Sequence, residues 1–251
     1  MPKQKQSDKA EFILDTNESL SNAIRRNTGQ IPILAIEDVE IHKNDSALYD
    51  EIISHRLGLI PLKDTRKLNE PEKCSCEGKG CAKCQLKISL KAKGPAIVYS
   101  GDLKGDVEII YDKMPIVILD KDQELEFVAF AQLGKGIKHT KFSPGLIYYR
   151  NISDIKIKNS ENAEKIISKL GDSIINIPKS KIKTGDIYKC TKDEDFITAI
   201  SDNLDSIEIA LGKEIVFFIE SWGQMNAKEI FSEAVKSLNN NLKEVSKALK
   251  K

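Results

Sequence analysis

Apolar residues recur every three or four positions between residues 226 and 249, which predicts a long amphipathic helix near the end of the sequence. At ~1.5 Å per residue this helix is roughly 35 Å long. Its apolar stripe packs either along the chain's own sheet or partly on a second subunit, and the pattern favours neither. The stripe consists of Ile230, Phe231, Ala234, Val235, Leu238, Leu242, Val245 and Leu249.

Two shorter helices are expected in the first quarter of the chain, at residues 18–27 and 46–57. The first is capped by Thr16 or Asn17, because short polar side chains accept hydrogen bonds from free N–H groups at a helix start. Its apolar face carries Leu20, Ala23 and Ile24, and its last turn carries Arg25 and Arg26, which complement the helix dipole.

Strands are predicted where apolar residues alternate with polar ones or form short continuous runs. Residues 134–136 are expected to form a loop. The segment 154–201 is polar and is interpreted as irregular, with a helix at 161–170 and part of another at 196–200. The overall class is α+β. The expected strands are 11–14, 31–36, 39–41, 86–90, 116–119, 125–130, 147–149 and 215–220.

Four of the five cysteines fall within residues 74–84, in the pattern C-x-C-x4-C-x2-C. Zn²⁺ in structural sites prefers a closed tetrahedral shell, commonly of four thiolates, and a closed shell leaves no position for a substrate. We therefore expect one structural zinc ion. Two disulfides are the second interpretation and an iron–sulfur cluster the third. The predicted ligands are Cys74, Cys76, Cys81 and Cys84.

Composition narrows the functional classes. With 39 basic and 38 acidic residues, the net charge of +1 gives no overall electrostatic case for binding nucleic acid. No apolar run approaches the ~18 residues that suggest a membrane span, and no apolar run typical of a signal peptide follows Met1. We expect a cytoplasmic protein in a reducing compartment. The three histidines stand outside any known catalytic motif, so no catalytic residue is predicted.

Three further stretches are distinctive. They are the helix sequence NAIRR at 22–26, the segment LYDEIISHRLGLIPL at 48–62, and GKGIKHTKFSP at 134–144. Together with the cysteine loop, they closely resemble the α-like assembly subunit of multisubunit RNA polymerases, specifically its archaeal form. The resemblance covers nearly the whole chain and is weakest between residues 151 and 201.

The resemblance implies a discontinuous dimerisation domain, a sheet with a long C-terminal helix, formed by residues 1–41 and 148–251. Residues 42–147 would then form an inserted, mainly β domain with the zinc loop 74–84. Some relatives carry a ferredoxin-like module where this chain has residues 155–200. Each cluster needs about four thiolates, and only Cys190 remains there. We therefore expect a degenerate remnant with no iron–sulfur cluster.

The function implied is that of a non-catalytic scaffold in transcription. The chain would pair with the small subunit L and form a platform for subunits N and P and the large catalytic subunits. It would have no small-molecule substrate of its own, no membrane contact, and access to DNA only through the complex. Expected interface residues are Leu20, Ala23, Ile24, Arg25, Arg26, Phe231, Leu238, Leu242 and Val245.

The alternative is a free-standing zinc-containing module that binds nucleic acid or acts as an adaptor. Lysines at two places in the sequence would form its basic patches, and direct binding of DNA would depend steeply on salt. Lysines on alternating strand positions are more often a solvated face. The residues concerned are Lys87, Lys91, Lys93, Lys135, Lys138 and Lys141.

Overall fold

The computed structural model describes residues 8–63, 67–175, 182–200 and 204–250. The chain divides into two compact units. The first comprises Met1–Lys9, Arg26–Leu146 and Glu220–Lys251, and the second comprises Ala10–Arg25 and Ile147–Ile219. Short 3-10 helices occur at Thr28–Gln30, Pro71–Lys73, Ser100–Asp102, Thr140–Phe142, Gly171–Ser173 and Leu204–Ser206.

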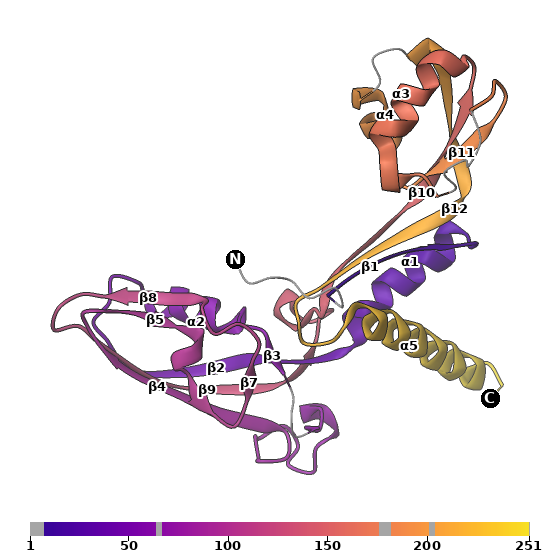
Figure 1. Ribbon diagram of the computed structural model, residues 1–251. Helices are drawn as coiled ribbons and strands as arrows, with labels where there is room; N and C mark the ends of the chain where they lie inside the picture. The colour runs from indigo at the N-terminus through magenta and orange to yellow at the C-terminus, as the bar shows by residue number, and fades with distance from the viewer. Residues whose placement is uncertain (1–7, 64–66, 176–181, 201–203, 251) are drawn as a thin grey trace. The chain divides into compact units, whose positions relative to one another are not determined.

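The first unit is built on an antiparallel sheet in the order β2-β9-β4-β6. Figure 1 labels β2, β9 and β4 of this sheet. Inward side chains of β9 are fully buried and alternate with half-buried ones, as expected for a strand with one covered face. The four strands are β2 (Pro32–Asn44), β9 (Glu124–Lys135), β4 (Gln85–Lys93) and β6 (Lys104–Gly105).

Two details of this sheet differ from the sequence predictions. The two runs 31–36 and 39–41 form one strand, β2, which is interrupted by irregularities between Ile36 and Asp38 and between Ile41 and Lys43. The predicted loop at 134–136 is wrong for its first two residues, because Gly134 and Lys135 still pair with the start of β2. Long-range pairing therefore overrides the local preference of glycine for a turn.

Helix α2 (Asp50–Gly58) and two short strand pairs complete the core of this unit. The pairs are β5 (Ala96–Tyr99) with β8 (Pro115–Leu119), and β3 (Leu62–Lys63) with β7 (Glu108–Ile109). The predicted start of the helix at residue 46 is wrong. The Asn44 side chain donates to Leu48 O (2.8 Å) and accepts from Ser46 N (3.1 Å), which holds residues 46–48 in a turn.

Helix α5 (Ala227–Ala248) confirms the long helix predicted near the end of the sequence. A capping box begins it: Asn226 Oδ1 accepts from Glu229 N (2.9 Å), and Asn226 N donates to Glu229 Oε2 (3.2 Å). These two bonds satisfy N–H groups that a helix start otherwise leaves free.

The second unit is built on a sheet in the order β1-β12-β10-β11, with helix α1 (Glu18–Asn27). Asn17 Oδ1 accepts from Leu20 N (2.8 Å), so Asn17 is the cap of α1. The ring of Phe217 in β12 stacks on that of Phe12 in β1, and the Tyr149 hydroxyl of β10 donates a hydrogen bond to Glu18 O of α1 (3.4 Å). The strands are β1 (Lys9–Leu14), β12 (Ile207–Ser221), β10 (Gly145–Ile157) and β11 (Ile187–Cys190).

The helices predicted at 161–170 and 196–200 are confirmed, but the interpretation of the rest of 154–201 as irregular is wrong where β10 continues to Ile157 and where β11 forms. Helices α3 (Ser160–Leu170) and α4 (Glu194–Ile200) enclose a buried cluster with β11, which pairs with the end of β10. The apolar residues of this cluster come from separate elements of the sequence and meet only through folding. Cys190 is fully buried in this cluster, as expected for a small apolar side chain. The ferredoxin-like origin of the segment stays a prediction.

Candidate metal centre and interaction surfaces

The cysteine loop folds through local backbone hydrogen bonds. Glu77 N donates to Cys74 O (3.0 Å), and Gln85 N donates to Cys81 O (2.9 Å). Gly80 has φ +85°, in the left-handed region that glycine adopts without strain. These two turns carry the side chains of both cysteine pairs toward a common centre, as the sequence spacing suggested.

The four sulfur atoms lie at distances that fit one small ion. Sγ of Cys74 is 3.5 Å from Sγ of Cys81, and Sγ of Cys76 is 3.5 Å from Sγ of Cys84. All four sulfurs lie within 4.8 Å of one another. A tetrahedral ion with metal–sulfur bonds of about 2.3 Å spaces its ligands about 3.8 Å apart, whereas a disulfide needs about 2.05 Å. The arrangement can therefore hold a metal ion and contains free thiols.

The thiols differ in their proton affinity. Hydrogen bonding from Cys84 lowers the pKa of Cys76 to about 6 against the opposing effect of burial. Burial raises the pKa of Cys84 to about 12. Hydrogen bonds from the neighbouring thiols thus stabilise a thiolate at Cys76, whereas burial disfavours one at Cys84. A bound divalent cation stabilises the thiolate form of each ligand, which is the reason four thiolates gather around a metal.

A short ion-pair network fastens the loop to the sheet. Glu70, which precedes the loop, contacts Lys73 (2.5 Å) and Lys135 of β9 (3.3 Å). Burial alone would raise the pKa of Glu70, but the two lysines outweigh it and the pKa is lowered. In addition, Asn69 N donates to Lys83 O (2.9 Å), so both flanks of the loop are joined. The sequence offered no signal for the contact between Glu70 and Lys135.

Helix α5 is covered on only part of its length. Ile230 and Ala234 in its first half are fully buried, and Leu238 is half-buried. Leu242 and Val245 farther along are each 57% exposed. Phe231, the remaining predicted interface residue on this helix, is half-buried. The apolar stripe predicted from the sequence is therefore divided into a covered half and an uncovered half.

The predicted interface residues of α1 also differ in how far their side chains are exposed. Leu20 is 46% exposed and Ala23 is half-buried, but Ile24 is buried within the chain. Arg25 and Arg26 are both exposed.

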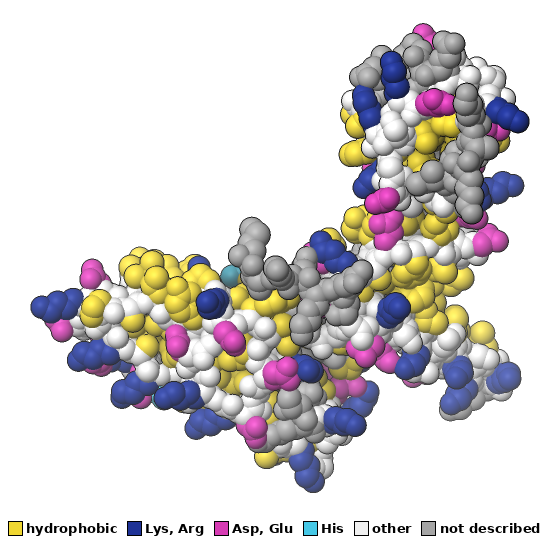
Figure 2. Space-filling model, viewed as in Figure 1, with side chains coloured by type: hydrophobic (Ala, Val, Ile, Leu, Met, Phe, Trp, Pro, Cys, Tyr) yellow, Lys and Arg dark blue, Asp and Glu magenta, His cyan; other side chains and the backbone are white. Residues whose placement is uncertain are grey.

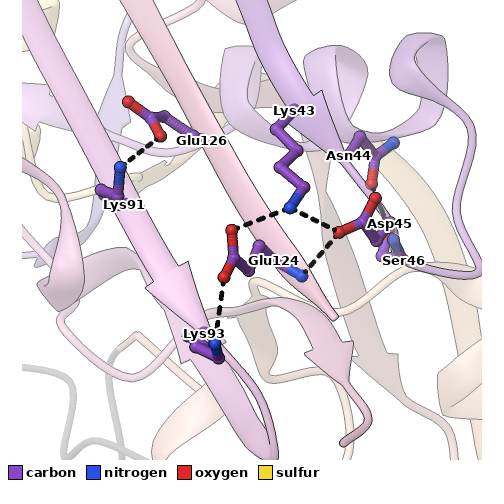
Figure 3. Close-up of polar contacts among 8 residues, drawn as sticks. All are labelled: Lys43, Asn44, Asp45, Ser46, Lys91, Lys93, Glu124 and Glu126. Atoms are coloured by element: carbon purple, nitrogen blue, oxygen red, sulfur yellow. Dashed lines mark hydrogen bonds and ion pairs between the residues drawn. The ribbon is translucent and has the colours of Figure 1, made fainter. Parts of the chain in front are cut away.

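Most of the lysines considered for a nucleic-acid patch are neutralised. On the outer face of the sheet, Lys93 pairs with Glu124 (3.2 Å) and Lys91 with Glu126 (2.7 Å) (Figure 3). Glu124 also accepts from Lys43 (2.9 Å), and these contacts lower its pKa. In Figure 2, Lys and Arg side chains follow the edge formed by β4, with acidic side chains among them.

The second lysine group, in the 134–144 segment, is paired as well. Lys135 contacts Glu70, while Lys138 (3.8 Å) and Lys141 (2.5 Å) both contact Glu37. Within the described part of the chain, Lys87 is the one member of the six without an ion pair.

The three histidines are exposed, and none belongs to a group of described residues that could hold a metal ion. His55 and His139 line one small pocket with Ser54 and Glu37. His139 Nδ1 accepts from Lys141 N (3.1 Å), which caps a short 3-10 helix. None of the described helices combines the length and apolar character needed to cross a membrane.

The sequence of this chain matches a known protein family. A family model described as the RNA polymerase Rpb3/RpoA insert domain matches residues 39–148. The chain is 36% identical over 251 residues to the DNA-directed RNA polymerase subunit Rpo3 of Pyrococcus furiosus. That match covers 94% of this chain and 90% of the relative.

Two further relatives bear the same name. Subunit Rpo3 of Archaeoglobus fulgidus is 29% identical over 255 residues, which covers 96% of this chain and 94% of the relative. Subunit Rpo3 of Methanothermobacter thermautotrophicus is 44% identical over a shorter stretch of 131 residues, 49% of each chain.

Proposed function

Because this chain belongs to the Rpo3 family of archaeal RNA polymerase subunits, we propose that it is the assembly platform of that enzyme. It is a non-catalytic subunit of DNA-directed RNA polymerase. In the proposed role it pairs with the small subunit L, and the pair then receives subunits N and P and the large catalytic subunits in the cytoplasm.

The uncovered half of α5 is the observation that carries this role. Leu242 and Val245 continue the stripe whose first half is buried in the chain's own fold. Exposed apolar side chains in a continuous row mark an interaction surface more often than a solvated face. Obligate interfaces exceed about 2,000 Å² and resemble a domain core cut in half, which fits a stripe that passes from one chain's core onto another chain.

Residues of α1 would add to the same kind of contact. Leu20 supplies an exposed apolar side chain with Ala23 beside it, while Ile24 supports the helix from inside. Arg25 and Arg26 are exposed and would form charge-assisted hydrogen bonds to a large subunit, while Arg25 also donates to Asn22 Oδ1 of the same helix (2.9 Å). Phe231 and Leu238 would line the border between the covered and uncovered halves of α5.

The domain organisation we propose follows the family. An inserted domain at 42–147 carries the cysteine loop, and residues 1–41 and 148–251 form the dimerisation domain. The match of the insert-domain model to residues 39–148 supports this division. Catalysis would belong to the large subunits.

We assign one structural Zn²⁺ to Cys74, Cys76, Cys81 and Cys84. Four sulfurs within 4.8 Å of one another fit its preferred shell, and zinc is borderline soft and so suits thiolates. The ion would hold the two turns of the loop together and present them rigidly beside β4. No iron–sulfur cluster is expected in this chain.

The free-standing nucleic-acid module is the less favoured function. Five of its six candidate lysines pair with carboxylates, which reduces the positive charge available to backbone phosphates.

Native mass spectrometry of the tagged chain, purified from its own cells, tests the proposal. We expect a defined complex that contains a small L-like subunit and the large polymerase subunits, with one zinc assigned to this chain. A lone stable monomer or a homodimer would reject the platform role. The metal is tested separately by elemental analysis, so a failure of the zinc assignment leaves the assembly result intact.

A further inference from the structure

A groove of about 550 Å³ lies in the first unit, where four segments far apart in the sequence meet. Its walls are the residues that follow α2, the loop before β8, the segment that leads into β10, and the turn between β12 and α5. Side chains from all four segments line it, among them Leu59, Tyr111, Lys141, Leu146, Trp222 and Gln224.

The turn between β12 and α5 is held rigidly in this wall. Ser221 Oγ donates to Met225 O and accepts from Gly223 N (2.8 Å), and Trp222 N donates to Pro144 O (3.1 Å). Gly223 has φ +96°, and a Cβ there would come within 2.6 Å of Ile110. These hydrogen bonds and the close approach of Gly223 to Ile110 therefore fix the backbone position of Trp222.

Large apolar side chains of this groove are left in contact with solvent. Leu59, Leu146 and Trp222 are 48%, 47% and 41% exposed. Trp222 is the single tryptophan of the chain. Tryptophan and tyrosine are the residues that most often carry the binding energy of protein interfaces, because they bury a large area with little loss of entropy.

Polar groups in the groove also lack partners. Among the described residues, the Trp222 indole N–H and the Tyr111 hydroxyl have no hydrogen-bond acceptor. Gln224 Oε1 is buried and has no donor in the described part of the chain. An extended polypeptide backbone presents a row of C=O groups, which complements the two donors of Trp222 and Tyr111.

The charge of the groove wall limits the kinds of molecule that can bind in it. The one charged residue of the groove wall, Lys141, is 15% exposed and pairs with Glu37 at 2.5 Å. No free positive charge in the described wall would attract a phosphate or a carboxylate, so nucleic acid and acidic peptides are poor matches. A neutral, apolar segment fits best.

Two of the stretches that carry the resemblance to polymerase subunits converge here. Leu59, Ile60 and Pro61 come from the segment HRLGLIPL, and Thr140, Lys141 and Ser143 come from the segment at 134–144. None of these six side chains belongs to the four-cysteine site, and a shared binding surface accounts for their meeting.

We propose that this groove is a docking site for an extended, uncharged and apolar segment of another polymerase subunit, with Trp222 as its central anchor. The proposal rests on the platform function. It adds a second surface, separate from the uncovered half of α5, at which a different partner segment is held.

A photo-crosslinking amino acid tests the occupant. Benzoylphenylalanine replaces Leu146 in the full chain, which is assembled with the other recombinant subunits into polymerase and irradiated. We expect cross-links to one segment of another subunit, identified by peptide mass spectrometry as apolar. The same substitution at Ile137, which is 70% exposed and outside the groove, is the control. Cross-links to a second copy of this chain, or a pattern equal to the control, would overturn the docking site.

A pair of variants tests the energetics. Leu59→Gln combined with Leu146→Gln should weaken retention of the partner subunit by about tenfold or more, because two groove side chains lose their apolar contact. Ile137→Gln should leave retention unchanged, and circular dichroism verifies that both variants are folded. Equal retention by the double variant and the wild type would reject the proposal. If the wild-type chain itself fails to enter polymerase, the platform function fails instead.

Discussion

The side-chain amide of Asn241 donates a hydrogen bond to Asn27 Oδ1 at 2.9 Å, across 214 positions of the sequence. Ser237 Oγ reaches the same oxygen at 3.4 Å. These polar contacts lie between the first half of α5, whose apolar side chains are buried, and its second half, whose apolar side chains are exposed. Asn27 therefore anchors the helix on one side, and Leu242 and Val245 extend beyond the anchor into solvent.

A negative charge at Leu242 should separate assembly from folding. Leu242→Asp should leave the unfolding free energy of the isolated chain within about 0.5 kcal/mol, since the side chain is already exposed. Binding of the L-like subunit should weaken by about 100-fold, because the carboxylate would be buried without a partner. Calorimetric unfolding and isothermal titration measure the two quantities.

Asn240→Asp is the matched control for that variant. It adds the same charge outside the apolar stripe, at an exposed position. Its binding should resemble the wild type. Equal binding by Leu242→Asp and Asn240→Asp would place the partner elsewhere.

Loss of one thiol should abolish metal binding. Cys76→Ser or Cys84→Ser leaves three sulfurs around the site, and a hydroxyl is a poor ligand for Zn²⁺. We expect less than about a tenth of the wild-type zinc content at micromolar free zinc by elemental analysis. Cys190→Ala, which removes the cysteine outside the loop, should retain one zinc per chain. Stoichiometric zinc in either loop variant would reject the four-ligand site.

The metal-free loop should react with alkylating agents in a defined order. The pKa of Cys76 is about 6 and that of Cys84 is about 12, and the thiolate is the reactive form. At pH 7, iodoacetamide should modify Cys76 about a hundredfold faster than Cys84. It should also modify Cys76 faster than Cys190, whose pKa is raised by burial. The rate at Cys76 should rise with pH through about 6 and then level off. Peptide mass mapping after a short pulse measures this, and first modification at Cys84 would contradict the assignment.

Gly223 should resist substitution more strongly than a glycine in open space. Gly223→Ala forces a side chain into φ +96° and against Ile110, so we expect a loss of about 1–3 kcal/mol. Gly171→Ala meets only the backbone strain, because no atom lies within 4 Å of its Cβ position at φ +47°. Its cost should be about 1 kcal/mol. Calorimetric unfolding measures the loss of unfolding free energy in each variant. Equal losses would contradict a steric clash between the new side chain at position 223 and Ile110.

Local patterns along the chain were sufficient to determine several elements. The period of the apolar residues predicted α1 and α5, and the spacing of the four cysteines predicted that their sulfurs share one centre. Both are short-range properties. A helix repeats every 3.6 residues, and an eleven-residue loop brings its own side chains together with few contacts from distant parts of the chain.

Tertiary structure decided the features that depend on residues far apart in the sequence. The helices at 161–170 and 196–200 were predicted one by one, but only folding packs α3, β11 and α4 into one buried cluster. Only folding showed that Glu124 and Glu37 neutralise lysines, that α5 is covered on half its length, and that Trp222 lines a groove. Burial and ion pairing are properties of neighbours in space, and the pattern along one chain does not contain them.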